Sequence, residues 1–201
     1  MKIIKYIFVL YLFFFSNFFL VFADSFDEWK INFKNHAINE GVSKKTLNEL
    51  IDNARFLSNV IKYDRYQPEF YEDTKTYISK RASNKKLFNG KKLYRNNVVI
   101  IDKISTKYSI DKSLLLALMG IETNFGTYLG KMDIISSLAT LSYDKRRSEF
   151  FTEELLILLK LIDLKIIDPL TLYGSWAGAF GNFQFMPRTI KIMLSIITQT
   201  H

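Results

Sequence analysis

Residues 114–126 read L-L-L-A-L-M-G-I-E-T-N-F-G, which predicts an apolar helix carrying one carboxylate, Glu122, near its end. Asp111 is placed to cap this helix, because an Asp side chain can accept hydrogen bonds from the free N–H groups of a first helical turn. Gly126 suits the left-handed turn that commonly ends a helix. The stretch therefore predicts a helix whose last turn presents a single ionisable group.

Glu122 shares one helical face with apolar residues. The spacing i, i+3, i+4, i+7 places Leu115, Leu118, Met119 and Glu122 on that face. Removing a carboxylate from water disfavours its charged form, and a carboxylic acid that stays protonated near neutral pH can act as a general acid. The alternative is that Glu122 emerges at the helix end and is solvated, since an unpaired buried Glu is rare.

A second stretch, residues 174–187, reads G-S-W-A-G-A-F-G-N-F-Q-F-M-P and holds three of the eight glycines of the chain. Glycine at this density, beside one tryptophan and three phenylalanines, indicates backbone packed close to bulky groups. The structural alternative is a tight, aromatic-filled turn before a helix that begins at Pro187, since proline is favoured at a first helical position.

The first 23 of the 201 residues have the pattern of a secretory signal peptide. Lys2 and Lys5 precede an apolar run over residues 7–22, and the segment ends in V-F-A before Asp24. An uncleaved membrane anchor is the alternative, although the run is slightly short for the ~20 residues of a comfortable span. We therefore expect an exported, periplasmic protein with a single domain over residues 24–190.

Charge and cysteine content narrow the classes of partner and chemistry. The formal net charge is +8, which favours an anionic partner such as an acidic polymer, anionic lipid or nucleic acid. Export makes nucleic acid the least suitable of these, and association with a membrane surface is left open. The chain has no cysteine, which excludes disulfides, thiolate metal sites and a cysteine nucleophile.

The remaining pattern predicts a mainly α-helical domain, because 3.6-residue periodicity recurs and no strand alternation is evident. Ser25 and Glu28 form a capping box before a first helix. Further helices are expected over residues 44–54, 69–81, 83–107 with a weak point at Gly90, 133–142 and 148–164. Residues 56–66 are expected to be irregular or extended, with a break at Pro68.

Four segments in order resemble the lytic murein transglycosylase B family of bacterial peptidoglycan-cleaving enzymes. They are D-R-x-Q-P-E-F at 64–70, G-I-E-T-N-F-G at 120–126, L-A-T-L-S-Y at 138–143 followed by Arg146 and Arg147, and the stretch 174–187. The resemblance implies an α-rich fold of the α+β lysozyme superfamily, with the catalytic Glu at the end of a helix on the floor of a glycan groove.

The resemblance also implies roles for individual residues. Glu122 corresponds to the catalytic acid/base, and Ser175 and Gln184 correspond to positions that touch substrate near the cleaved bond. Arg146 and Arg147 correspond to a pair that holds glycan or peptide-stem groups. Tyr77, which none of the quoted motifs contains, is assigned to an aromatic residue of the groove.

The implied chemistry needs one carboxylate, whereas an ordinary glycosidase uses two. In a lytic transglycosylase the acid protonates the oxygen that leaves N-acetylmuramic acid and then deprotonates the C6 hydroxyl of that sugar, which closes a 1,6-anhydro ring. The attacking hydroxyl belongs to the bound substrate, so its positional entropy is largely prepaid. Neither a metal nor an organic cofactor is required. Asp133, Asp144 and Glu149 follow Glu122 in sequence, but they fall in predicted caps or polar segments.

The resemblance ends at about Thr189, before the calcium-binding loop of EF-hand type and the further groove residues of the family. Residues 191–201 form a divergent tail, and no D-x-D-x-D-G run occurs, so we expect a C-terminally truncated domain without a calcium site. Two functions remain open: an exported lytic transglycosylase, and a cationic remnant that binds the cell wall without turnover. A hydrolytic lysozyme is disfavoured by the lack of a second carboxylate.

Overall fold

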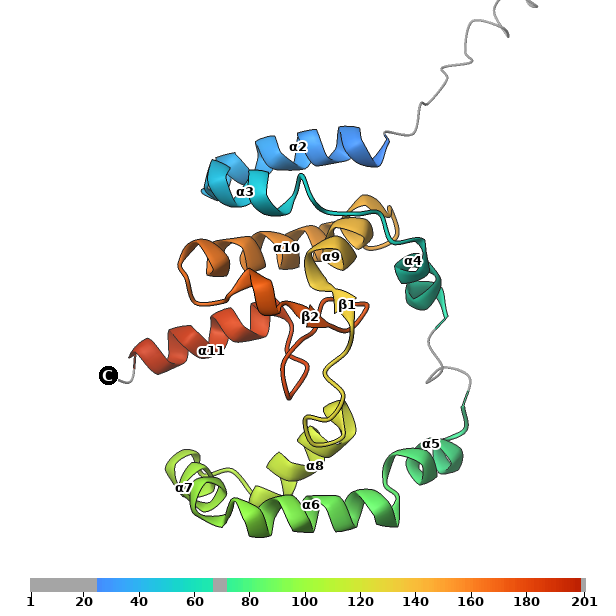
Figure 1. Cartoon of the computed structure of the whole chain (residues 1–201), viewed down its shortest axis with the longest axis vertical. Coiled ribbons are helices and arrows are strands. Elements are labelled where there is room, and N and C mark those ends of the chain that lie inside the picture. Colours follow the sequence, from blue (N-terminus) through green and yellow to red (C-terminus); the bar gives the residue numbers. More distant parts are fainter. Residues whose placement is uncertain (1–24, 67–71, 200–201) are drawn as a thin grey trace, which may run out of the picture.

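The computed structural model describes residues 25–66 and 72–199, and these form a mainly helical molecule (Figure 1). The helices are α2 (Phe26–Asn39), α3 (Lys44–Leu50), α4 (Ser58–Arg65), α5 (Thr74–Arg81), α6 (Asn84–Asn96), α7 (Val98–Tyr108), α8 (Lys112–Thr123), α9 (Ile134–Tyr143), α10 (Ser148–Asp163), the 3-10 turn η2 (Pro169–Thr171) and α11 (Pro187–Gln199). Two short strands, β1 (Met132–Asp133) and β2 (Tyr173–Gly174), pair antiparallel with Met132 opposite Gly174. The predicted signal peptide and Pro68 lie outside the described residues.

The core belongs to a main lobe, which we define as α2–α4, the β1–β2 pair and α9–α11. Helices α9 and α10 lie at its centre and carry most of the fully buried side chains, including Leu138, Leu155 and Leu158, all with no exposed surface. Phe26 and Trp29 of α2 stack at 5.4 Å between ring centroids and cover this core from one side. The main lobe therefore contains the hydrophobic cluster that stabilises the fold.

The other four helices, α5–α8, form a helical arm that lies apart from α2, α3 and α10 (Figure 1). Helix α6 packs against α7 and α8. No residue of α5 or α6 is fully buried, and in α7 only Ile101 is. The arm is therefore thinly packed, and α8 carries Glu122 from the arm toward the main lobe.

The predicted helix starts are confirmed where a side chain caps the first turn. Ser25 and Glu28 make both hydrogen bonds of a capping box, and Asp133 accepts the Ser136 N–H at the start of α9. The helix predicted from Ser148 ends within one residue of Leu164, and the last helix begins at Pro187. The helix predicted over 44–54 ends earlier, at Leu50.

Residues 56–66 were predicted to be irregular, which is wrong, because Ser58–Arg65 form α4. The buried residues of α4 are Val60 and Asp64, one turn apart. An aspartate at a core-facing position hides the apolar stripe by which a short helix is recognised in sequence. Contact with α9 stabilises α4, although the local sequence lacks a continuous apolar stripe. At the start of α4, the Leu57 N–H donates to Thr140 Oγ1 at 3.0 Å.

The long helix predicted over 83–107 is divided, but at Asn97 rather than at Gly90. The Asn97 side chain donates to the Leu93 carbonyl at 3.0 Å, a local bond of the kind that competes with helical geometry. Gly90 stays helical because the Phe125 ring packs against it. A Cβ at Gly90 would lie 3.2 Å from that ring, and one at Gly120 would lie 2.6 Å from it.

Candidate active site

The end of α8 is tied to the glycine-rich stretch by Thr123, a buried residue beside Glu122. Thr123 Oγ1 lies 2.9 Å from the Asn182 carbonyl and 3.1 Å from the Met119 carbonyl, and it accepts the Gly126 N–H at 3.0 Å. These contacts join two stretches that are about sixty residues apart in sequence. The backbone that carries Glu122 is therefore fixed relative to the glycine-rich stretch. We call the part of that stretch before Pro187 the 174–186 loop.

Helix α8 ends as a left-handed turn that starts earlier than expected. Asn124, Phe125 and Gly126 all have positive φ, at 50°, 62° and 78°. Gly126 was predicted to stop the helix, but Asn124 is the residue that follows the last helical position. Asparagine tolerates this conformation better than most residues with a side chain. The turn places Glu122 in the last helical turn, as the sequence predicts.

The side chain of Glu122 is exposed to solvent. This differs from the expectation that its apolar helical face removes it from water, and it matches the alternative of a carboxylate that emerges at the helix end. Leu118, on the same face, is 44% exposed. The shared face of α8 therefore borders open space in this chain.

The glycine-rich stretch packs as tightly as its composition indicates. A Cβ at Gly130 would lie 2.1 Å from the carbonyl oxygen of Gly174, and a Cβ at Gly178 would lie 2.4 Å from Leu138 of α9. Glycine is required at these positions because two backbones, or a backbone and a core leucine, are in direct contact. The loops on either side of the β1–β2 pair are held together in this way.

Ser175 and Gln184 both lie in this loop and both contribute to its shape. Ser175 Oγ accepts the Ala179 N–H at 3.0 Å. Gln184 has a φ of 48°, and its Nε2 donates to the carbonyls of Leu129 and Gly181 at 3.1 and 3.0 Å. Gln184 thus connects the loop to the segment that follows α8. Each side chain has one hydrogen-bonding group that these bonds do not use. In Ser175 it is the hydroxyl proton, and in Gln184 it is the Oε1 acceptor.

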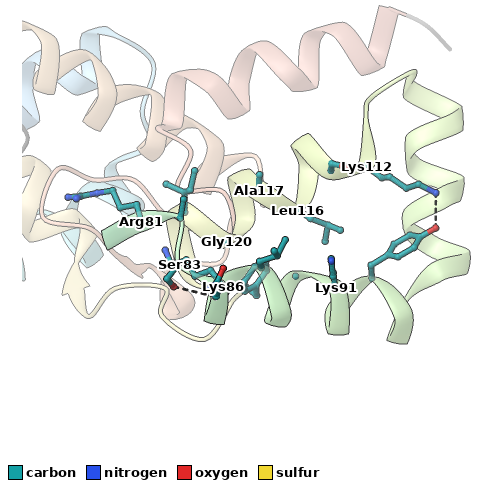
Figure 2. Close-up of a pocket in the computed structure, with 16 residues that line it drawn as sticks. Arg81, Ser83, Lys86, Lys91, Lys112, Leu116, Ala117 and Gly120 are labelled. Atoms are coloured by element: carbon teal, nitrogen blue, oxygen red, sulfur yellow. Dashed lines mark hydrogen bonds between the residues drawn. The ribbon is translucent and has the colours of Figure 1, made fainter. Parts of the chain in front are cut away.

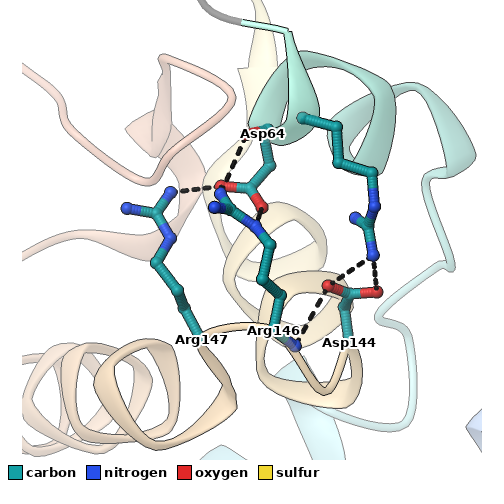
Figure 3. A network of polar contacts seen from close by, with 5 residues as sticks. Asp64, Asp144, Arg146 and Arg147 are labelled. Carbon is teal, nitrogen blue, oxygen red and sulfur yellow. Dashed lines mark hydrogen bonds and ion pairs between the residues drawn. The ribbon is translucent and has the colours of Figure 1, made fainter.

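Arg146 and Arg147 converge on Asp64 of α4 (Figure 3). Arg146 Nε donates to Asp64 Oδ2 at 2.6 Å and its Nη2 donates to the Asp64 carbonyl at 2.8 Å, while Arg147 pairs with Oδ1. The Asp64 side chain is 1% exposed, whereas the two arginine side chains are 43% and 39% exposed. The pair is therefore a partly open cationic surface anchored on a buried carboxylate.

Electrostatics at Asp64 favour the ionised carboxylate. Burial alone would raise its pKa, but the hydrogen bonds from Arg146 and Arg147 and the charges of both arginines outweigh burial and lower the pKa below its ordinary value. A second ion pair lies beside it, between Arg65 and Asp144 at 2.9 Å. Asp64 could not be predicted as a partner of the arginines from the sequence, because Arg146 and Arg147 follow it by more than eighty positions.

Tyr77 lies on α5 of the helical arm. The guanidinium of Arg81 lies 3.7 Å from the centre of its ring, a cation–π contact, and Arg81 also pairs with Glu72 at 3.1 Å. No recorded contact connects Tyr77 with Glu122 or with the glycine-rich stretch, so its place in a common site stays a prediction.

Three of the acidic residues that follow Glu122 in sequence are engaged elsewhere or placed apart. Asp133 caps α9 and also accepts from the Ser136 hydroxyl at 3.0 Å, Asp144 pairs with Arg65, and Glu149 lies in the first turn of α10. Within the described ranges, no group of three or more histidine, aspartate or glutamate side chains is arranged to hold a metal ion.

The model of the transglycosylase SLT domain matches residues 25–193 of the chain. The chain belongs to the transglycosylase SLT domain family. Over 85 residues this SLT-domain chain is 41% identical to membrane-bound lytic murein transglycosylase B of Escherichia coli (strain K12), an alignment that covers 42% of the chain and 24% of that protein. The resemblance to the transglycosylase B family is thereby confirmed.

Solved SLT-domain structures share the fold. SltB3 from Pseudomonas aeruginosa, in complex with NAG-NAM-pentapeptide, superposes with a TM-score of 0.80 at 30% identity, covering 84% of this chain and 45% of that one. The Escherichia coli lytic transglycosylase Slt35, in complex with bulgecin A, gives 0.72 at 29% identity, with coverage of 82% and 53%. The lysozyme-like fold is confirmed, and the chain spans about half the length of these relatives.

The part of this SLT-domain chain that the structure describes contains no helix both long and apolar enough to cross a membrane.

Proposed function

We propose that this chain is an exported lytic transglycosylase that cleaves the β-1,4 bond between N-acetylmuramic acid and N-acetylglucosamine in peptidoglycan. The observation that carries the proposal is the placement of Glu122. It is an exposed carboxylate in the last turn of α8, beside a buried threonine that fixes this turn against the 174–186 loop. Family membership supplies the substrate class, because SltB3 is solved with NAG-NAM-pentapeptide.

Glu122 acts twice in this mechanism. As a carboxylic acid it gives a proton to the glycosidic oxygen while the bond from C1 of N-acetylmuramic acid to that oxygen breaks. As a carboxylate it then takes the proton of the C6 hydroxyl of the same sugar while the bond from O6 to C1 forms. The same carboxyl group therefore gives one proton and recovers one proton, and no water is consumed. This supports a role for a single glutamate, since Asp133 and Asp144 are occupied by a helix cap and an ion pair.

The exposure of Glu122 is consistent with a polymeric substrate. A glycan strand laid over the end of α8 would remove the carboxylate from water only in the complex, so the acid form would be favoured when the substrate is bound. The open face of α8 leaves room for this approach.

Four other residues hold the strand in this proposal. Ser175 uses its hydroxyl proton and Gln184 its free Oε1, each already oriented by a hydrogen bond to the loop backbone. Arg146 and Arg147 keep N–H groups that Asp64 does not use, and a guanidinium can hold a carboxylate or carbonyl of a peptide stem. Tyr77 is proposed as an aromatic contact further along the strand.

Mass spectrometry of the products tests this proposal. Purified peptidoglycan is incubated with the chain, and the released muropeptides are analysed. We expect products that end in 1,6-anhydro-N-acetylmuramic acid, which are lighter by one water than the corresponding reducing-end products. Reducing-end products would instead mean hydrolysis. Release of no product, with the protein retained on pelleted wall, would mean a cationic wall-binding protein without turnover.

A further inference from the structure

The helical arm contains a cavity of about 480 Å³ between α6 and α8, which is separate from the residues assigned to glycan cleavage. Its volume lies within the ~300–1,000 Å³ typical of small-molecule sites. The floor is apolar and consists of Leu87, Tyr94, Leu116, Ala117, Ile121 and Phe125. Neither Glu122 nor any residue of the 174–186 loop lines it. The cavity therefore requires an occupant with an apolar body.

The shape of the cavity follows from two matched helical faces. Its lining residues recur on α6 from Ser83 to Tyr94 and on α8 from Lys112 to Ile121. At ~1.5 Å of rise per residue, the α6 side extends over roughly 16 Å. Phe125 fills the gap between Gly90 and Gly120 and closes the floor. The cavity is consequently a long, narrow trough between helices, a shape that suits an extended acyl chain.

The rim of the trough is cationic. Figure 2 shows Arg81 and Lys112 toward opposite ends, with Lys86 and Lys91 along α6 between them. Among the described residues that line the cavity there is no aspartate or glutamate. The rim charges are therefore not neutralised by the cavity itself, and charge complementarity favours an anionic head group on the occupant.

The four cations differ in what they already contact. Lys112 Nζ donates to the Tyr94 hydroxyl at 2.7 Å and to Asp102 at 2.9 Å, and Arg81 pairs with Glu72. For Lys86 and Lys91 no ion pair with a described residue is present. These two lysines, five residues apart and both lining the cavity, are the ones whose ammonium groups are available to an anion.

We propose that this trough binds a single-chain fatty acid, with the acyl chain along the apolar floor and the carboxylate at Lys86 and Lys91. An extended peptide segment fits less well, because its backbone N–H and C=O groups would face a floor that offers few hydrogen-bond partners. An acyl chain has no such groups. The proposal does not depend on glycan cleavage by Glu122.

The test is the affinity for decanoate below its micellar concentration, measured by calorimetry and by displacement of a fluorescent fatty acid. We expect one decanoate per chain and at least roughly tenfold weaker binding of uncharged 1-decanol, since charge-assisted contacts to two lysines are lost. Ala117→Trp fills the trough and should abolish binding, while circular dichroism verifies that the variant remains helical. Equal affinity for decanoate and decanol would overturn the head-group assignment.

A matched pair of charge reversals makes the site assignment falsifiable. Lys86→Glu with Lys91→Glu should weaken decanoate binding by roughly tenfold or more. Lys44→Glu with Lys45→Glu makes the same change in net charge on exposed residues of α3 in the main lobe and should leave binding unchanged. Equal losses in both doubles, or retained binding in Ala117→Trp, would overturn the proposal. So would a concentration-dependent dimer that Ala117→Trp disrupts and decanoate does not.

Discussion

Asp64 is the ionisable residue whose environment the fold controls most closely. Its side chain is 1% exposed and receives hydrogen bonds from two arginines, which hold its pKa below the ordinary value of an aspartate against the effect of burial. A carboxylate whose pKa is lower in the folded than in the unfolded chain stabilises the fold at pH values above its unfolded pKa. That contribution is lost as the pH falls through the folded-state pKa.

We expect Asp64→Asn to reduce the free energy of unfolding at pH 7 by roughly 1–3 kcal/mol, because the variant leaves two arginines without their carboxylate. The difference from the parent should begin to shrink below about pH 4, where the carboxylate of the unfolded chain takes up a proton, and should vanish as the pH falls through the lower folded-state pKa. Urea unfolding across a pH series measures this. Asp73→Asn, which changes an exposed cap of α5, is the control. A difference between parent and Asp64→Asn that stays constant down to pH 2 would contradict the role of the ionised form.

The role of Arg146 and Arg147 in wall binding is best measured in a variant in which Asp64 has been replaced. In the parent, Arg146→Ala with Arg147→Ala would remove two cationic partners of a buried carboxylate and would destabilise the fold. In an Asp64→Asn background, the same double substitution should weaken pelleting with peptidoglycan, and the loss should be largest at low salt. Binding equal to that of Asp64→Asn alone at low salt would remove both arginines from the site.

At the scale of elements, the decisive feature is the contact between the segment after α8 and the glycine-rich stretch. Gly130 and Gly174 bring two backbones into direct contact, and Gln184 bonds to the Leu129 carbonyl in the same region. The position of Glu122 depends on this contact, because Thr123 bonds to the same loop.

Two glycine substitutions distinguish the free-energy cost of disturbing the close backbone contact from the cost of a left-handed backbone conformation. Gly130 and Gly181 have similar positive φ, 90° and 78°, but only at Gly130 would a Cβ meet another backbone. Gly181→Ala should cost roughly 1–2 kcal/mol from its left-handed conformation. Gly130→Ala should cost at least ~1–3 kcal/mol more, because the two loops must separate. Urea midpoints of both variants provide the measurement, and equal losses would mean that the contact is not rigid.

Much of the element order could be predicted from the sequence, because capping side chains act within one turn. Ser25, Asp111 and Asp133 mark helix starts that the structure confirms. Helix α4 could not be predicted, since its buried position 64 is an aspartate that becomes compatible with burial only through arginines distant in sequence. The exposure of Glu122 was one of two alternatives that the sequence left open, because periodicity identifies a face but not what lies opposite it.

The whole molecule divides into a well-packed main lobe and a thinly packed helical arm. Helices α9 and α10 carry many fully buried side chains, whereas α5 and α6 carry none. Local opening requires less free energy where few apolar contacts are lost. The arm holds both Glu122 and the fatty-acid trough, so its stability bears on each proposal.

Hydrogen exchange should distinguish the main lobe from the helical arm. Amides of α9 and α10 should exchange only by global unfolding, and those of α5–α7 should exchange on the order of a hundredfold faster. Exchange followed by mass spectrometry of peptic fragments gives the comparison. Decanoate should slow exchange in α6 and α8 and leave α9 and α10 unchanged. Uniform protection across the main lobe and the helical arm would mean that they unfold as one unit.

The central claim is that Glu122 is the acid and base of glycan cleavage, and the most direct measurement is product formation by Glu122→Gln. Glutamine has nearly the same shape but cannot donate a proton as an acid, and the exposed position should tolerate it without loss of fold. Release of anhydro-muropeptides should fall by ~10²–10⁴ or more while wall binding stays near that of the parent. Glu149→Gln and Asp133→Asn, in a first turn and a cap, should retain most of the rate. Release by Glu122→Gln at more than about a tenth of the parent rate would contradict the assignment.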